Sequence, residues 1–141
     1  MKELVDIARE VRKRCEEFSF SEKARDYDFY MQADLSCMCG VASFALSVAL
    51  DGENIINRVF CGEYRRNIND DWKFGETHCW VCVNGRIVDI TATQFGVKEK
   101  VHIVSACNRH YIKGKVVNFD DFKDWDRQKP SVELVSKIIK K

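Results

Sequence analysis

A run of apolar residues from Gly40 to Leu50 (GVASFALSVAL) constrains the fold of this chain more than any other segment. Its residues are apolar except for one glycine and two serines, so a helix over this run presents apolar side chains on nearly every side. The run is about half as long as the roughly 20 residues that a membrane-spanning helix needs. We therefore expect a helix buried at the centre of a domain, ended by Asp51 and Gly52, and no membrane partner.

Segments with helical periodicity lie on both sides of the apolar run. Near the N-terminus, apolar residues recur every three or four positions and predict an amphipathic helix with the stripe Leu4, Ala8, Val11, Cys15 and Phe18. This stripe makes Cys15 a core residue. A second, short helical stretch is expected over Glu22–Met31. In the tail, Phe119–Trp125 is expected to form a short helix or turn, and Ser131–Lys140 predicts an amphipathic helix after Pro130.

The middle of the chain is typical of a β-sheet. Five short runs are rich in valine, isoleucine and aromatic residues, and glycines bound them. The predicted strands are Ile55–Phe60, His78–Val83, Arg86–Thr91, Val101–Ala106 and Tyr111–Val117. Helices come first and strands later, without β-α-β alternation, which predicts a single α+β domain over residues 1–141 with N-terminal helices packed on a C-terminal antiparallel sheet.

Charge and cysteine content narrow the functional classes. Lysine and arginine total 23 against 22 for aspartate and glutamate, so the net charge of +1 provides no basic surface for nucleic acid. The N-terminal segment is charged throughout and lacks the apolar centre of a secretory signal, so we expect a cytoplasmic protein. Seven cysteines are an odd number in a chain large enough to build its own core, which favours free thiols over a disulfide scaffold.

The segment from His78 to Asp89 is the most informative one for function. Asn84-Gly85 is a strong signal for a two-residue hairpin turn, and this turn sets Val83 opposite Arg86. Side chains alternate along strands, so the register places His78, Trp80 and Asp89 on one face, with the histidine and the aspartate as diagonal neighbours. A carboxylate that orients an imidazole is part of a nucleophilic triad.

The expected nucleophile is Cys39. It opens the buried helix, where free backbone amides and the helix dipole lower the pKa of a thiol. Cys37 is the alternative, although it would lie in the preceding loop. The order along the chain is then Cys39, His78 and Asp89.

Zinc binding is a competing hypothesis, because Cys79-x-x-Cys82 has the spacing of a zinc-ligand pair and other cysteines and histidines could complete the site. Positions i and i+3 of a strand face opposite sides of the sheet, so the hairpin register argues against this pair binding one ion. We therefore expect no metal and no cofactor.

The segment from about residue 35 to residue 96 resembles the papain-like and transglutaminase-like cysteine enzymes, in particular their bacterial members. The similarity lies in Cys39-Gly-Val-Ala-Ser43 at the start of a helix, His78-x-Trp80 on one strand and Asp89-Ile-Thr-Ala-Thr-Gln94-Phe95 on the next. The resemblance implies a Cys-His-Asp triad and a thioester acyl-enzyme. It implies a hydrolase or acyl transferase that acts on an amide, a peptide or a glutamine side chain.

In such enzymes a glutamine or a backbone amide holds the oxyanion, and the candidates here are Gln32 and Gln94. Trp80 is a candidate wall of the substrate cleft. The expected partner is a protein or peptide substrate. The alternative is a non-catalytic module on the same fold that binds a peptide or partner protein.

Overall fold

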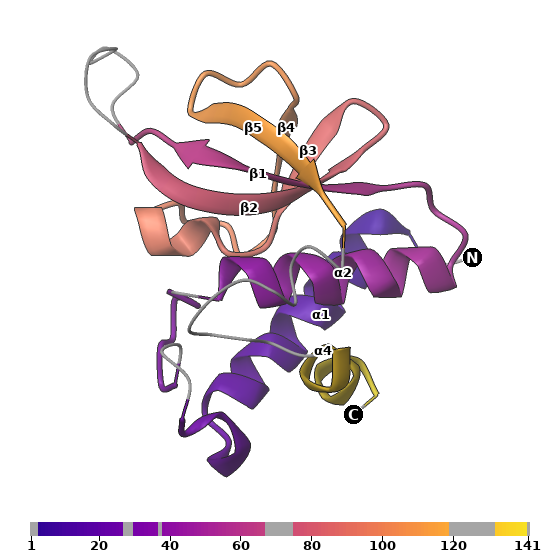
Figure 1. The fold of residues 1–141 in the computed structure, drawn as a ribbon, viewed down its shortest axis with the longest axis vertical. Helices are drawn as coiled ribbons and strands as arrows, with labels where there is room; N and C mark the ends of the chain where they lie inside the picture. The colour runs from indigo at the N-terminus through magenta and orange to yellow at the C-terminus, as the bar shows by residue number, and fades with distance from the viewer. Residues whose placement is uncertain (1–2, 27–29, 37, 67–74, 119–131, 141) are drawn as a thin grey trace.

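A computed structural model describes residues 3–26, 30–36, 38–66, 75–118 and 132–140 (Figure 1). Its helices are α1 (Leu4–Ser19), α2 (Cys39–Gly52) and α4 (Val132–Ile139), with 3-10 turns η1 (Glu22–Ala24) and η2 (Ala92–Phe95). Its strands are β1 (Arg58–Tyr64), β2 (Glu76–Val83), β3 (Arg86–Asp89), β4 (His102–Ser105) and β5 (Tyr111–Val117). They form an antiparallel sheet in the order β4-β3-β2-β1-β5, so the domain is α+β as expected.

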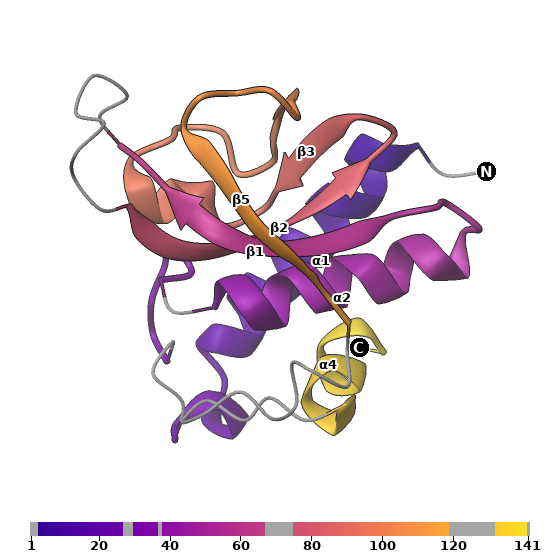
Figure 2. The same ribbon diagram turned by 45° about the horizontal axis from the view of Figure 1, so that its top comes forward.

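Helix α2 lies between the sheet and the pair formed by α1 and α4 (Figures 1 and 2). This position explains its apolar composition, because neighbours cover it on several sides. Helix α1 instead buries one stripe, which includes Val11, Cys15 and Phe18, and keeps the opposite side exposed. Burial raises the pKa of Cys15 to about 12, in agreement with its expected place in the core. Among the described residues, no helix has the length and apolar character needed to cross a membrane.

The β2–β3 hairpin has the predicted register, with Val83 opposite Arg86 and Val81 opposite Val88. Alternate side chains of the sheet therefore form two clusters. Valines such as Val81 join the helices in the main core, whereas Trp80 packs on the opposite face with tyrosines of β1 and β5. The turn residues Asn84 and Gly85 both have positive φ, as a tight hairpin turn requires.

The sheet curls strongly around the Trp80 face. The rings of His102 on edge strand β4 and Tyr111 on edge strand β5 stack at 6.5 Å although three strands lie between them. In a flat sheet that separation would be roughly 19 Å, at about 4.8 Å between neighbouring strands. The curl is accompanied by a register shift between β1 and β5, where Gly62 and Gly114 approach the opposing backbone closely.

Several predicted boundaries are wrong. Helix α2 continues through Asp51 and Gly52 and is capped by Glu53. The first strand begins at Arg58 instead of Ile55, because the preceding residues connect α2 to the sheet and Asn57 binds back to α2 side chains.

Two helical predictions have a different outcome. Only η1 forms within the expected Glu22–Met31 stretch, and residues 27–29 of that stretch lie outside the described residues. The segment Phe119–Trp125 also lies outside them. The amphipathic C-terminal helix is confirmed as α4, within one residue of its predicted bounds.

Candidate functional site

Cys39 is the first residue of α2, as the sequence predicted. Met38 caps the helix, and its carbonyl accepts a hydrogen bond from the amide of Ala42 at 2.8 Å. The amides of the first turn have no partner within the helix, and their dipoles favour a negative charge at this end. Cys39 as a residue is partly exposed, and its position at this end of the helix favours ionisation of its thiol. Cys37, the alternative nucleophile, lies outside the described residues.

His78 and Asp89 form a buried pair, with 2.6 Å between Nε2 and Oδ2. An ionised carboxylate only accepts hydrogen bonds, so Nε2 carries the hydrogen. The backbone amide of Thr91 donates to Oδ1 of the same carboxylate at 2.9 Å. Burial raises the pKa of Asp89, but the charge of His78 and these hydrogen bonds outweigh it and hold the pKa below its ordinary value of 3.8. Asp89 is therefore an anion that fixes the imidazole.

The thiol of Cys39 lies close to the imidazole of His78. Hydrogen bonding from the Cys79 thiol has the largest effect on Cys39 and holds its pKa well below the ordinary value of 9.0. Contact with His78 and the positive charge of that ring lower the pKa of Cys39 further, and burial opposes them. Nδ1 of His78 is buried and completes no hydrogen bond of good geometry within the described residues.

The protonation of His78 complements that of Cys39. Burial disfavours a charged ring, but the charge and hydrogen bond of Asp89, followed by the contact with Cys39, raise the pKa of His78 from 6.5 to about 10. A raised pKa on the ring and a lowered pKa on the sulfur favour a thiolate beside an imidazolium. Such an ion pair is the reactive form of a cysteine nucleophile.

Aromatic rings enclose His78. The ring of Phe95 meets it edge-on at 4.7 Å, and Tyr64 and Trp80 lie at 6.2 and 5.9 Å between centroids. As a result, the imidazole has no exposed surface. The expectation that Trp80 walls a substrate cleft is wrong, because its side chain is fully buried inside the curled sheet.

Neither glutamine suggested for the oxyanion forms a hydrogen bond with Cys39 among the described residues. Gln94 lies in η2 and donates its amide to the carbonyl of Thr91 at 3.0 Å, so its own turn occupies it. Gln32 is exposed in the loop before α2. The donor best placed for an oxyanion is the backbone amide of Cys39 itself, which lies in the unpaired first turn of the helix.

Tyr111 is a member of the site that the sequence did not indicate. Its hydroxyl donates to Oδ2 of Asp89 at 2.7 Å, the same oxygen that binds His78. Burial and the nearby charge of Asp89 raise the pKa of Tyr111, so it remains a donor across the physiological range. An aromatic residue at the start of a strand carries no local signal of this role, because the contact depends on the curl of the sheet.

Arg12 is a second residue that sequence reasoning missed. Its guanidinium is buried and donates to the carbonyl of Ile90 at 2.7 Å and to Oγ1 of Thr93 at 2.9 Å. It also reaches the carbonyl of Ala33 in the loop before α2, at 3.3 Å. One side chain of α1 thus joins the segment after Asp89 to the segment before the nucleophile. The only sequence signal is an arginine directly after Val11 in the apolar stripe.

The arrangement of the cysteines does not support zinc binding by Cys79 and Cys82. Both lie on β2, where alternation directs them to opposite faces. Cys82 packs with the Trp80 cluster, whereas Cys79 contacts Cys39 at the helix side. Within the part of the chain that the structure describes, no group of three or more cysteine, histidine or acidic side chains is arranged to hold a metal ion.

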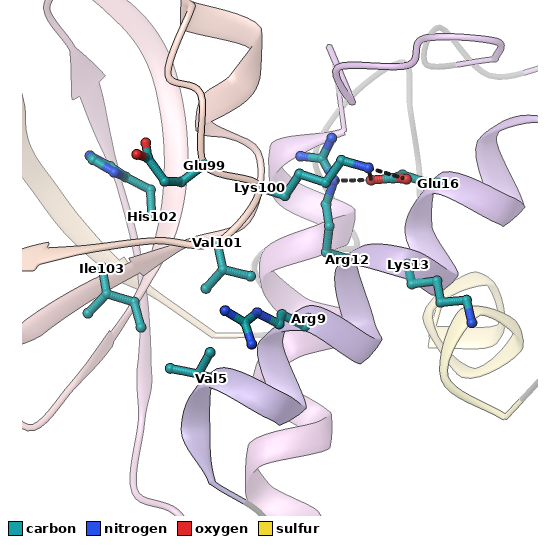
Figure 3. A pocket seen from close by; sticks show the side chains of 10 residues that line it. All are labelled: Val5, Arg9, Arg12, Lys13, Glu16, Glu99, Lys100, Val101, His102 and Ile103. Atoms are coloured by element: carbon teal, nitrogen blue, oxygen red, sulfur yellow. Dashed lines mark hydrogen bonds and ion pairs between the residues drawn. The ribbon is translucent and has the colours of Figure 1, made fainter.

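A cleft of about 800 Å³ lies elsewhere, between α1 and the chain around β4 (Figure 3). Arg9 lies beside apolar side chains there, and Glu16 bridges the positive charges of Arg12 and Lys100. His102 lines this cleft from β4. None of the three predicted catalytic residues lines it, so it is separate from the Cys39 site.

Comparisons of this chain with protein-family models, with curated proteins and with solved structures gave no match.

Proposed function

We propose that this protein is a cysteine-dependent hydrolase or acyl transferase with Cys39 as nucleophile, His78 as general acid and base, and Asp89 as the orienting carboxylate. The observation that carries the proposal is the buried 2.6 Å contact from Nε2 of His78 to Asp89, with the thiol of Cys39 beside the same ring. The order and roles also agree with the resemblance to papain-like and transglutaminase-like enzymes.

In the proposed reaction, the Cys39 thiolate attacks the carbonyl carbon of an amide or acyl group and forms a carbon–sulfur bond. The backbone amide of Cys39 stabilises the oxyanion, and the His78 imidazolium gives its proton to the leaving amine. A thioester remains on Cys39. Water or an amine then attacks the thioester while His78 takes up the proton, which restores the thiolate.

The local environment suits these roles. Asp89 keeps Nε2 of His78 protonated, which directs Nδ1 toward proton exchange on the Cys39 side. Tyr111 and Thr91 hold the carboxylate, so the imidazole has a fixed orientation before any substrate binds. The partial exposure of Cys39 supplies the side from which a carbonyl group can approach.

The test compares the alkylation of Cys39 with that of an ordinary thiol in the same chain. Cys107 is exposed and serves as the internal reference. With iodoacetamide at pH 6, we expect Cys39 to react at least roughly 10-fold faster than Cys107, because the thiolate is the nucleophile and the pKa of Cys39 is held well below the ordinary value of a thiol. His78→Asn should remove most of this advantage and leave the rate of Cys107 unchanged. Equal rates in the unmodified protein would contradict the proposal.

A second measurement addresses catalysis. An acyl-thioester donor should acylate Cys39, visible as a mass increase that hydroxylamine removes. A peptide library and a glutamine-containing peptide then separate chain cleavage from ammonia release. Cys39→Ala should abolish all three signals.

One observation favours a second candidate, a non-catalytic binding module. The imidazole of His78 has no exposed surface, so in this arrangement a substrate reaches it only past neighbouring side chains. A module that uses the buried pair only to stabilise its fold predicts slow alkylation of Cys39 and no acylation. It also predicts that a peptide binds equally well to Cys39→Ala.

A further inference from the structure

The cleft of about 800 Å³ between α1 and the chain around β4 runs along a free strand edge. Strand β4 is the last in the sheet order and pairs with β3 alone among the described residues. His102 and Ile103 are consecutive in β4, and both line the cleft (Figure 3). Because side chains alternate between the two faces of a strand, consecutive residues share a cleft where it follows the outer edge of that strand. The unpaired backbone groups of β4 therefore face the cleft.

The opposite wall of the cleft is helix α1, which contributes cations without a partner. Arg9 is exposed and has no ion pair or hydrogen bond with another described residue. Figure 3 shows its guanidinium directed from α1 toward the part of the cleft where Val5 and Val101 lie. Lys13, one turn further along α1, also lines the cleft and has no ion pair within the described part of the chain. The helix wall thus carries positive charge that is open to a ligand.

The acidic side chains of the cleft do not balance the charge of Arg9. Glu16 binds both Arg12 and Lys100. Glu99 comes from the strand side, and its carboxylate is directed away from Arg9 (Figure 3). A guanidinium binds a carboxylate through two parallel hydrogen bonds, so the group that best satisfies Arg9 is a carboxylate supplied by a ligand.

We propose that this cleft is a docking site for an extended peptide segment in which apolar residues flank an acidic one. The segment adds a sixth strand at the outer edge of β4, where its backbone pairs with the free N–H and C=O groups of that strand. Its carboxylate binds Arg9, and its apolar side chains contact Val5, Val101 and Ile103, which are partly exposed. The inference is independent of the reactivity of Cys39, because none of the proposed catalytic residues lines the cleft.

The combination of a strand edge and a cation favours a peptide over two other occupants. A small carboxylate such as glutarate satisfies Arg9 but leaves the backbone of β4 unpaired. A second copy of this chain, joined edge to edge through β4, pairs the backbone but brings no carboxylate from that strand, whose sequence is His-Ile-Val-Ser. An acidic peptide satisfies both features of the cleft at once.

The test measures the binding of a fluorescein-labelled peptide to the full chain by fluorescence anisotropy. The probe is a hexapeptide that alternates valine and glutamate, and the comparison peptide has lysine in place of glutamate. We expect the glutamate peptide to bind at least about 10-fold more tightly, because Arg9 and Lys13 attract its carboxylates and repel ammonium groups. No binding of the glutamate peptide up to about 1 mM, or equal binding of the two peptides, would overturn the inference.

A matched pair of variants tests the role of Arg9. Arg9→Gln should weaken the binding of the glutamate peptide about 10-fold, because it removes the charge-assisted pair with the carboxylate. Arg14→Gln is the control, since it removes the same charge from α1 but lies outside the cleft, where Arg14 binds Glu10. It should bind the peptide as the unmodified protein does. An equal loss in both variants would mean that only the net charge of the helix matters, which contradicts a built site.

Methylation of the peptide backbone tests the added strand. Two further glutamate peptides carry N-methyl groups on alternate amides, in opposite phases, so that only one of them loses the hydrogen-bond donors that face β4. That peptide should fail to bind, whereas the other should bind as the unmethylated probe does. Equal binding of the two methylated peptides would refute pairing with the strand edge.

The other occupants give distinct results. Displacement of the peptide by an equal concentration of glutarate would show a site for free carboxylates, and a dimer in sedimentation that excludes the peptide would show a second copy on β4; either result overturns the inference. In amide NMR spectra, the peptide should shift the signals of residues 101–105 and of α1 around Arg9. Shifts confined to the surroundings of Cys39 would place the peptide in the proposed active site instead and would also overturn it.

Discussion

The hydrogen bond from the Tyr111 hydroxyl to Asp89 is the contact whose removal gives the most direct test of the site. Tyr111→Phe deletes one oxygen and keeps the ring that packs against Trp80 at 5.1 Å. The lost interaction is a 2.7 Å hydrogen bond to the buried Asp89 carboxylate. His78 and Thr91 continue to donate to that carboxylate, so Asp89 loses one partner and is not left alone.

The expected cost follows from this geometry. A hydrogen bond to a charged group contributes about 1.5–3 kcal/mol to the free energy of unfolding. For a chain of this length, 1 kcal/mol shifts the melting temperature by about 3 °C, so Tyr111→Phe should melt about 5–9 °C lower. Urea unfolding at pH 7 should show the same loss as a lower midpoint with an unchanged slope.

The loss of stability in Tyr111→Phe should depend on pH. The folded-state pKa of Asp89 is depressed below 3.8, so its stabilisation is present above that pH and is lost as the pH falls through the folded-state value. Tyr111 is one of the groups that depress this pKa. The difference between Tyr111→Phe and the unmodified protein should therefore be largest near neutral pH and should shrink as Asp89 becomes protonated.

Tyr64→Phe is the matched control. Tyr64 belongs to the same buried aromatic cluster, but its hydroxyl forms no hydrogen bond within the described residues. Removal of the Tyr64 hydroxyl should change the free energy of unfolding by less than about 0.5 kcal/mol. If Tyr111→Phe is no more destabilised than Tyr64→Phe, the bond to Asp89 does not support the site and the reasoning is refuted.

Three further predictions address other parts of the molecule. Arg12→Leu should lower the free energy of unfolding by about 3 kcal/mol, because it leaves buried acceptors unpaired, whereas exposed Arg9→Leu should be nearly neutral in the same urea titration. Gly62→Ala should lower the melting temperature, since its new carbon would lie 2.1 Å from a carbonyl oxygen of β5; Gly52→Ala, with open space around it, should not. The alkylation rate of Cys39 should reach its plateau well below pH 9.0, in keeping with its lowered pKa, and a midpoint near 9.0 would contradict the ion pair.

Local sequence patterns predicted the central helix, the β2–β3 hairpin and part of the site. The apolar run predicted a central helix because a segment without a polar side can only be buried, and α2 occupies that position. Asn84-Gly85 fixed the hairpin because few residues tolerate the positive φ of a tight turn. Once that register was set, strand alternation alone placed His78 and Asp89 on a common face, where the structure joins them.

Element ends were less predictable. Asp51 and Gly52 predicted the end of the helix, yet α2 continues through them. Hydrogen bonds between Asn57 and α2 side chains hold this end of the helix. The sequence predicted Trp80 as a cleft residue, because alternation along a strand does not show which face of the sheet is open to solvent. The curl of the sheet closes that face, and no local pattern encodes it.

The sequence by itself determined the helices α1, α2 and α4, the hairpin and the pairing of His78 with Asp89, because these depend on periodicity and on a turn between close neighbours in the chain. Only the tertiary structure decided that Tyr111 binds Asp89, that Arg12 braces the segments beside the site, and that Cys79 meets Cys39. These contacts join residues that are 22, 78 and 40 positions apart. They form only when the sheet curls and the helices pack beneath it, and that geometry arises from the whole core at once.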